Sequence, residues 1–302
     1  MTIWIIDPRD PVIFGDGKPF SAIPGTSARS LPFPYPSTVA GAVRSHSGRD
    51  RNGRFDATQI ATLKQTGIRG PLLVALDCTG STGDWLLPAP GDCLVLRAGE
   101  EQYGKRLWLR PLSTPADCAT NLADGLHPIG AKWIVKEKLH PHPSRFWTWD
   151  AYQRWLIDPG DDPAAVDLEK IGLPGPARES RTHVSIVPSQ QTAREGFLFQ
   201  TSGLEFLHTQ RNGDGSAPPL YTATKLALAV DTEASLRADW GFVGGERRVA
   251  RWRKGSASFP TCPPGIEKSI KDNRSCRLIL ATPAIFDKGY LPTWLRQIAP
   301  NL

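Results

Sequence analysis

Hydrophobic residues in this chain come in short runs that Gly and Pro separate. The apolar run at residues 2–6 predicts a buried first strand. Small apolar residues then recur at helical spacing after Ser37, which is a good N-cap residue, so we expect a helix up to His46. A second helix, rich in aromatic residues, is expected over residues 146–156. The pattern predicts many short elements joined by long irregular connections.

The second half of the chain is richer in strand patterns. Residues 181–187 alternate between polar and apolar side chains, and residues 195–207 are typical of a hairpin or one long strand. Residues 277–282 also predict a strand. Residues 220–230 mix β-branched and small side chains and remain ambiguous between helix and strand.

A polar segment rich in Pro and Gly, residues 158–176, separates these two patterns. A strand, a loop, a helix and further strands precede it, and a strand-rich half follows it. This order fits two α+β units side by side. We therefore expect an N-terminal domain over residues 1–165 and a C-terminal domain over residues 166–302.

The composition limits the class of protein. Of 302 residues, 40% are hydrophobic, which supports real cores, and the 28 Gly and 28 Pro residues imply many turns and long loops. No apolar run reaches the ~18 residues of a membrane span, so no membrane partner is expected. No Cys-x-x-Cys pair occurs, and the cysteines are typical of reduced thiols in a cytoplasmic protein. They are Cys78, Cys93, Cys118, Cys262 and Cys276.

The charge permits an anionic partner without requiring one. The net charge is +6, and 24 Arg residues stand against 12 Lys. Arginine is the better residue for bidentate phosphate contacts and for stacking on bases. Codon bias in a GC-rich genome would produce the same excess, so both explanations stay open.

The most informative local feature is the stretch from residue 241 to residue 254. Gly244 and Gly245 let the backbone approach a ligand closely, because they carry no Cβ atom. Basic side chains that suit phosphate follow them. These are Arg247, Arg248, Arg251, Arg253 and Lys254. The alternative is a tight turn followed by a solvated basic strand.

Strong catalytic and cofactor motifs are absent from the sequence. Lys18 follows Gly-Asp-Gly, but the spacing is wrong for a Walker A loop and Pro19 lacks the required hydroxyl. Asp161 and Asp162 lie in a Pro-Gly turn that favours a solvated acidic loop over a metal site. His140 and His142 have no Cys or carboxylate at ligand spacing. We expect no metal and no cofactor, although a dispersed Ser/His/Asp triad stays open.

Four motifs follow one another in a specific order. They are Phe14-Gly15-Asp16-Gly17-Lys18-Pro19-Phe20; Pro36-Ser37-Thr38-Val39-Ala40-Gly41-Ala42-Val43-Arg44; Arg178-Glu179-Ser180-Arg181-Thr182-His183 with Thr192-Ala193-Arg194-Glu195-Gly196-Phe197-Leu198-Phe199; and Gly241-Phe242-Val243-Gly244-Gly245-Glu246-Arg247-Arg248 with Ala281-Thr282-Pro283-Ala284-Ile285-Phe286. Together they resemble the family of subunit three of the Cmr complex, the type III-B CRISPR effector, in the repeat-associated mysterious protein (RAMP) superfamily. The resemblance spans nearly the whole chain.

This resemblance implies two ferredoxin-like units, similar to RNA-recognition motifs, with antiparallel sheets and long Pro/Gly-rich insertions. It implies a non-catalytic subunit that holds the 5′ tag of the CRISPR RNA (crRNA). The implied neighbours are the large signature subunit and the adjacent RAMP subunit of the backbone filament, with target RNA as an indirect partner. Family members continue past Ala281-Thr282-Pro283-Ala284 into a further strand, which this chain ends too early to contain. Another polypeptide or a missing tail would supply it.

A tag that is read specifically must be single-stranded, and holding it needs phosphate donors and flat stacking surfaces. The expected RNA contacts are Lys18, Arg44, His46, Arg178, Arg181, His183, Arg194, Gly244, Gly245, Arg247, Arg248 and Arg251. Alternatives remain open for several of them. Arg44 also suits the C-terminal end of a helix dipole, and the arginines of the third motif could pair with Glu179 and Glu195. The aromatic residues at 147–155 are typical of a core or a subunit interface.

Two rival functions remain. Endoribonucleases of the same superfamily can use a histidine to take the 2′-OH proton without a metal, and His46 with His183 would supply that pair. A pure protein scaffold, whose basic residues only solvate its surface, is the third possibility.

Overall fold

The computed structural model describes residues 1–17, 26–122, 126–212, 220–287 and 292. The chain divides into two compact units, each built from two separate stretches. Unit 1 comprises Met1–Leu86 and Pro174–Pro260, and unit 2 comprises Leu87–Leu173 and Thr261–Leu302. This division differs from the consecutive domains, 1–165 and 166–302, that the sequence predicts. Strands pair mostly antiparallel and helices are few, which confirms the α+β class.

Unit 1 contains one large sheet, a long hairpin and three short helices. Its elements are β1 (Thr2–Pro8), β2 (Ser27–Arg29), α1 (Pro36–Ser47), η1 (Ala57–Gln59), α2 (Ile60–Gln65), β3 (Ile68–Leu76), β4 (Thr82–Pro88, which runs past the end of the unit), β11 (Ala177–Val187), β12 (Thr192–Glu205), β13 (Leu207–Asn212), β14 (Leu220–Thr232), β15 (Trp240–Val243) and β16 (Arg248–Lys254).

The large sheet interleaves strands from both stretches of unit 1. Its order is β4-β3-β14-β1-β16-β15, with β13 also paired to β14. The ambiguous segment 220–230 is therefore a central strand, antiparallel to both β1 and β3. The continuous apolar run of β14 from Leu226 to Val230 is fully buried, as expected of a strand that is covered on both faces.

Helix α1 packs against β3 and β15 and buries Val39, Val43 and His46. The predicted helix is confirmed, but its predicted cap is wrong. Tyr35 is the N-cap and makes no side-chain cap bond, while Pro36 is the first helical residue. Because the proline ring holds φ near its helical value, Pro36 starts the helix one position before Ser37.

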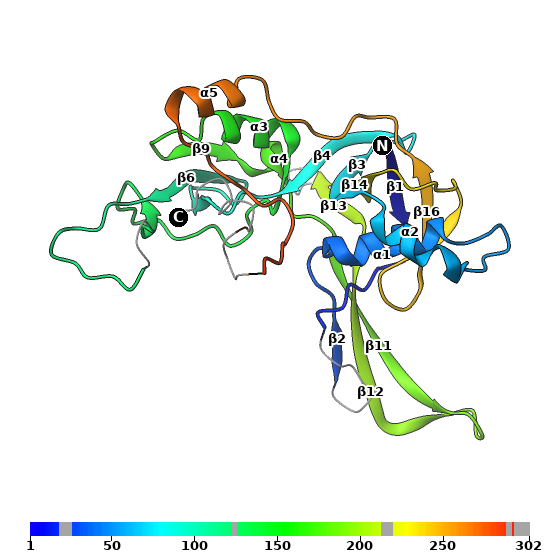
Figure 1. The fold of residues 1–302 in the computed structure, drawn as a ribbon. Coiled ribbons are helices and arrows are strands. Elements are labelled where there is room, and N and C mark those ends of the chain that lie inside the picture. Colours follow the sequence, from blue (N-terminus) through cyan, green and yellow to red (C-terminus); the bar gives the residue numbers. More distant parts are fainter. Residues whose placement is uncertain (18–25, 123–125, 213–219, 288–291, 293–302) are drawn as a thin grey trace. The chain divides into compact units, whose positions relative to one another are not determined.

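The strands β11 and β12 form a long antiparallel hairpin, which confirms strands over residues 181–187 and 195–207. Its register runs from Ala177 opposite Glu205 to Val187 opposite Thr192, with an irregularity between Val184 and Ile186. Strand β2 pairs parallel to β12. Figure 1 shows these three strands side by side.

Unit 2 contains smaller sheets and a tryptophan-rich core. Its elements are β5 (Cys93–Arg97), β6 (Tyr103–Pro111), β7 (Ile129–Ala131), β8 (Phe146–Thr148), α3 (Trp149–Ile157), β9 (Ala164–Asp167), α4 (Leu168–Ile171), β10 (Gly172–Leu173) and α5 (Ile266–Asn273). Strand β6 pairs with β5, β7 and β9, and β8 pairs with β10.

The aromatic helix of unit 2 begins later than the sequence predicts. Residues 146–148 pair with β10 as a strand, and the hydroxyl of Thr148 then accepts a bond from the Ala151 N–H at 3.3 Å, which caps α3. Trp147 and Trp155 are 1% and 0% exposed and meet edge to face at 5.9 Å. These aromatic residues form a core, as the sequence predicts.

The strand predicted over residues 277–282 is wrong. This segment forms no strand in the structure. Its first side chain, Arg277, instead donates to Asp92 Oδ2 at 2.9 Å and to the carbonyls of Trp155 and Leu156 at 2.6 and 2.9 Å. Side-chain bonds to the end of α3 therefore hold the segment in place of strand pairing.

Candidate nucleic-acid interface

The glycine-rich motif forms the turn between β15 and β16. The pair Val243–Arg248 closes this turn, and Gly244, Glu246 and Arg247 have φ values of 70°, 58° and 50°. A Cβ atom at Gly244 would lie 2.5 Å from Val12 Cγ1 and 2.7 Å from the Ile13 oxygen. Glycine is therefore required at residue 244 both by the left-handed backbone and by close packing. We call residues 244–247 the glycine loop.

The glycine loop and the hairpin both contact the segment at residues 12–15. The Gly245 N–H donates to the Ile13 oxygen at 2.7 Å. Val12 and Leu204 exchange two backbone bonds of 2.9 and 2.8 Å. Helix α1, which contains the second motif, also packs against β15. Parts of all four sequence motifs therefore fall within unit 1. Lys18, at the end of the first motif, lies outside the described residues.

Arg181 and Arg248 line one small cavity of about 10 Å³ together with Glu179. Arg181 forms an ion pair with Glu179, so the salt-bridged alternative is realised at this position. The Nε atom of Arg248 is buried and has no hydrogen-bond partner among the described residues. The structure thus brings together two of the predicted arginines and pairs one of them.

The other predicted residues of the hairpin are spread along it. Arg178 donates to the Ser30 oxygen at 3.0 Å. His183 stacks on Phe199 with 5.2 Å between ring centroids, and its Nε2 lies 2.8 Å from Thr201 Oγ1. Arg194 is exposed and lies 3.7 Å from the Phe197 ring centroid. Arg178 and Arg194 are both exposed.

Arg44 has a structural role in unit 1. Its Nε donates to the Leu63 oxygen at 3.0 Å and its NH2 to the Lys64 oxygen at 3.2 Å. These carbonyls end α2, so the guanidinium ties α1 to α2 and caps the second helix. An RNA contact at Arg44 stays a prediction.

His46 is enclosed in the core of unit 1. It is 6% exposed, stacks on Trp252 at 4.6 Å, and donates from Nε2 to the Arg237 oxygen at 3.0 Å. A Cβ atom at Gly241 would lie 2.7 Å from His46 Nδ1, so the chain also covers the second nitrogen. Burial lowers the pKa of His46. A general base must reach the substrate proton, and this ring is not placed to do so.

Strand β15 exposes two aromatic rings that the sequence analysis did not assign to a site. Trp240 is 52% exposed and Phe242 is 38% exposed. The guanidinium carbon of Arg9 lies 6.0 Å from the Trp240 ring centroid, and those of Arg49 and Arg247 lie 5.0 and 5.6 Å from that of Phe242. The spacing of Trp240 and Phe242 by two residues was a sequence signal for the rings, because alternate residues of a strand share a face. Nothing local in the sequence points to Arg9 or Arg49.

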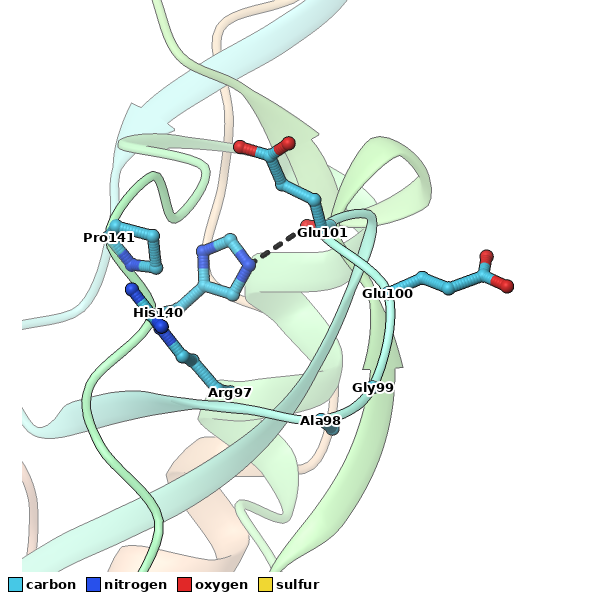
Figure 2. A pocket seen from close by; sticks show the side chains of 7 residues that line it. All are labelled: Arg97, Ala98, Gly99, Glu100, Glu101, His140 and Pro141. Atoms are coloured by element: carbon cyan, nitrogen blue, oxygen red, sulfur yellow. Dashed lines mark hydrogen bonds between the residues drawn. The ribbon is translucent and has the colours of Figure 1, made fainter. Parts of the chain in front are cut away.

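A cavity of about 240 Å³ in unit 2 has no features of a reactive site. Figure 2 shows His140 in its wall, with the ring directed at the backbone of Glu101. The His140 Nε2 donates to the Glu101 oxygen at 2.8 Å, and Nδ1 accepts from the His142 N–H at 3.2 Å. Both nitrogens thus serve the local backbone, and His140 is an ordinary structural histidine.

Within the described ranges, no group of three or more His, Cys, Asp or Glu side chains could hold a metal ion. Asp161 instead pairs with Arg110 and Lys132, both at 3.0 Å. Across the same ranges, no helix is long and apolar enough to cross a membrane.

The chain is similar to known CRISPR-associated proteins. A family model described as "CRISPR-associated protein (Cas_Cmr3)" matches residues 4–300. Two solved chains come from the type III-B Cmr-beta complex, one bound to cognate target RNA and AMPPnP in state 1, the other bound to cognate target RNA. Each is 14% identical and covers 86% of this chain, with TM-scores of 0.43 and 0.41. This chain covers 64% and 65% of their lengths, less than two thirds. No curated protein matches it.

Proposed function

This chain belongs to the CRISPR-associated Cas_Cmr3 family, and on that basis we propose that it is a non-catalytic, RNA-binding subunit of a type III-B Cmr effector complex. In this role it holds the 5′ tag of the crRNA. It bridges the large signature subunit to the adjacent backbone subunit and meets target RNA only indirectly. The proposal includes two ferredoxin-like units with long insertions.

The observation that carries the proposal is the meeting, within unit 1, of motifs that lie far apart in the sequence. The segment at residues 12–15 contacts both the glycine loop, through Gly245, and the base of the hairpin, through Leu204. Arg181 and Arg248 line the same cavity there. Arginine forks beside a close-packed backbone suit a single-stranded phosphate chain.

The distribution of charge supports the same assignment. Unit 1 contains 20 Lys and Arg residues against 15 Asp and Glu, a net charge of +5, whereas unit 2 contains 16 against 15, a net charge of +1. Nearly all of the excess positive charge therefore belongs to unit 1, which carries parts of all four motifs. Uncompensated positive charge raises the local concentration of an anionic chain.

RNA retention by the purified complex tests this proposal. The double variant Arg247→Ala with Arg248→Ala is expected to lose most copurifying RNA, since each arginine neutralises a phosphate. The matched control, Arg110→Ala with Arg154→Ala, removes one half-buried and one exposed arginine from unit 2 and is expected to keep its RNA. Equal RNA content in the two preparations would contradict the assignment of the glycine loop.

Salt dependence is a second test of the same proposal. Binding of tagged RNA is expected to weaken steeply between ~50 and ~200 mM salt, because phosphate neutralisation releases counterions. An affinity that does not change over this range would contradict an RNA grip based on arginines.

The endoribonuclease alternative is not favoured, because His46 is buried and both ring nitrogens are covered. Incubation of the chain with repeat RNA in EDTA is expected to leave the RNA intact. Cleavage that His46→Ala abolishes would overturn the non-catalytic assignment.

A further inference from the structure

Strand β15 is the last strand in the order of the unit 1 sheet and presents two aromatic rings on one face. Trp240 and Phe242 are exposed, while Gly241 and Val243 between and beside them are buried. Because alternate residues of a strand share a face, the two rings are spaced about 7 Å apart. That spacing is twice the ~3.4 Å rise of a stacked strand, so each ring can serve a separate base.

Each of these rings has an arginine beside it. Arg9 lies next to Trp240, and Arg49 and Arg247 lie next to Phe242. Within the part of the chain that the structure describes, none of these three arginines forms an ion pair with a carboxylate. A guanidinium that lies over a ring keeps its N–H edge open to a phosphate. We call these five residues the β15 aromatic face.

A groove of mixed charge adjoins the β15 aromatic face, and its lining includes Arg9, Lys225, Arg251 and Arg253 together with Asp7, Asp77 and Glu205. Trp240 lines a cavity of about 260 Å³ together with Lys225 and Arg251. A second cavity of about 610 Å³ shares Asp7, Lys225 and Arg251 with the first and extends to Arg253. The two cavities share these three residues, which lie on β1, β14 and β16, and we call them together the sheet groove.

Two cations that line the sheet groove, Arg9 and Arg251, form no ion pair among the described residues. Asp7 accepts from Lys225 at 2.9 Å, so this pair largely neutralises itself. Arg253 donates to the Gly80 oxygen. Arg251, opposite Asp7 in the strand register, is exposed and makes no ion pair or side-chain hydrogen bond within the described ranges. Arg251 therefore keeps an open guanidinium in the groove, as Arg9 does beside Trp240.

We propose that the β15 aromatic face and the sheet groove form a second contact surface for single-stranded RNA, next to the glycine loop. Trp240 and Phe242 each stack on a separate base, and Arg251 neutralises a phosphate of the same strand. This inference rests on the proposed function, because it takes RNA as the ligand. In this arrangement the glycine loop contacts the RNA backbone, and the β15 aromatic face contacts the bases.

An open edge strand can also pair with a strand of a partner protein. Strand addition uses the backbone of the edge and does not need an arginine beside each ring. Aromatic rings combined with unpaired arginines are what sequence-tolerant binding of single-stranded nucleic acid uses. The chemistry of β15 therefore favours RNA.

Fluorescence anisotropy with the full chain and a labelled single-stranded RNA of about 16 nucleotides tests the inference. Trp240→Ala is expected to weaken binding about tenfold without changing the salt dependence, and Trp240→Phe to recover most of the loss. Arg251→Ala is expected to lower the slope of log affinity against log salt by about 0.7. The matched controls in unit 2, Trp133→Ala and Arg154→Ala, are expected to bind as the unsubstituted chain does.

The outcomes separate this inference from the proposed function. If the full chain binds RNA through the glycine loop, but Trp240→Ala and Arg251→Ala behave like their controls, the inference alone is overturned. If the full chain binds no RNA even at low salt, both are overturned. If Trp240→Ala keeps its RNA affinity but no longer copurifies with a neighbouring subunit, the surface docks protein and the inference is overturned.

Discussion

The two units differ in what their positive charges contact. In unit 2, most of the ion pairs of the described residues occur, although it is the smaller unit: Lys105–Glu137, Arg110–Asp161, Lys132–Asp161, Arg154–Asp150, Lys170–Asp167, Lys271–Glu267 and Arg277–Asp92. In unit 1 the described residues form three: Arg69–Asp231, Arg181–Glu179 and Lys225–Asp7. The overall charge of the chain conceals this contrast. A basic side chain indicates an anionic ligand only where no carboxylate of the protein neutralises it.

The aromatic residues follow the same division. In unit 2, Trp147 and Trp155 are buried against each other, and the exposed Trp133 donates its Nε1–H to the Asp161 oxygen at 3.2 Å. In unit 1, Trp240 and Phe242 turn outward beside arginines that form no ion pair with any carboxylate the structure describes. The comparison suggests that unit 2 uses its charges and rings for its own stability, whereas unit 1 keeps some of both for a ligand.

The largest expected effect on stability is at the glycine loop. Gly244→Ala places a Cβ atom on a left-handed backbone and against Val12, so we expect the free energy of unfolding to fall by about 2–5 kcal/mol. Gly245→Ala is the matched control, because the nearest atom to its Cβ is the Ile13 oxygen at 3.4 Å. Its cost is expected to stay below about 1 kcal/mol. Chemical denaturation measures both, and equal losses would contradict the packing described for Gly244.

The next effect sharpens the contrast between the units. Arg277→Ala removes bonds to Asp92, Trp155 and Leu156 in unit 2, so we expect a loss of about 2–3 kcal/mol in the free energy of unfolding. RNA affinity is expected to stay unchanged. Arg154→Ala, which breaks an exposed pair within α3, is expected to cost less than about 0.5 kcal/mol. A drop in RNA affinity for Arg277→Ala would mean that unit 2 also takes part in binding.

The smallest effect concerns pH. Burial lowers the pKa of His46 below its ordinary value of 6.5, so the unfolded chain binds a proton more readily than the folded one. The stability contributed by neutral His46 is therefore present above about pH 6.5 and is lost as the pH falls through the folded pKa. His46→Phe is expected to reduce this slope by up to about 1.4 kcal/mol per pH unit. Denaturation at several pH values measures this slope. If His46→Phe leaves the slope of unfolding free energy against pH unchanged, His46 has the same pKa in the folded and the unfolded chain.

Local signals predicted local elements. The run with helical spacing after Ser37 predicted α1, although its N-cap, Tyr35, lies two residues before the predicted one, and the alternation of residues 181–187 identified β11. The division into units was not predictable, because β14 pairs with β1 and β3 from the other end of the chain. A continuous apolar run such as that of β14 is the same in a buried helix and a buried strand.

The candidate site was predictable only where its residues are neighbours in the sequence. The glycine loop carries its own signal in Gly244 and Gly245, and its left-handed turn follows from it. Arg247 lies near Phe242 in the sequence, but the other two cations beside the rings come from residues 9 and 49, so their contacts exist only after the sheet has formed. The error at residues 277–282 has a similar origin, since long-range bonds of Arg277 decide the path of that segment.

Ultraviolet crosslinking of the purified complex to its RNA, followed by mass spectrometry of the crosslinked peptides, tests most directly the claim that RNA contacts belong to unit 1. The account predicts crosslinks within residues 240–251, at Trp240, Phe242 and the glycine loop. Crosslinks confined to unit 2, for example at the exposed Trp133, would contradict it.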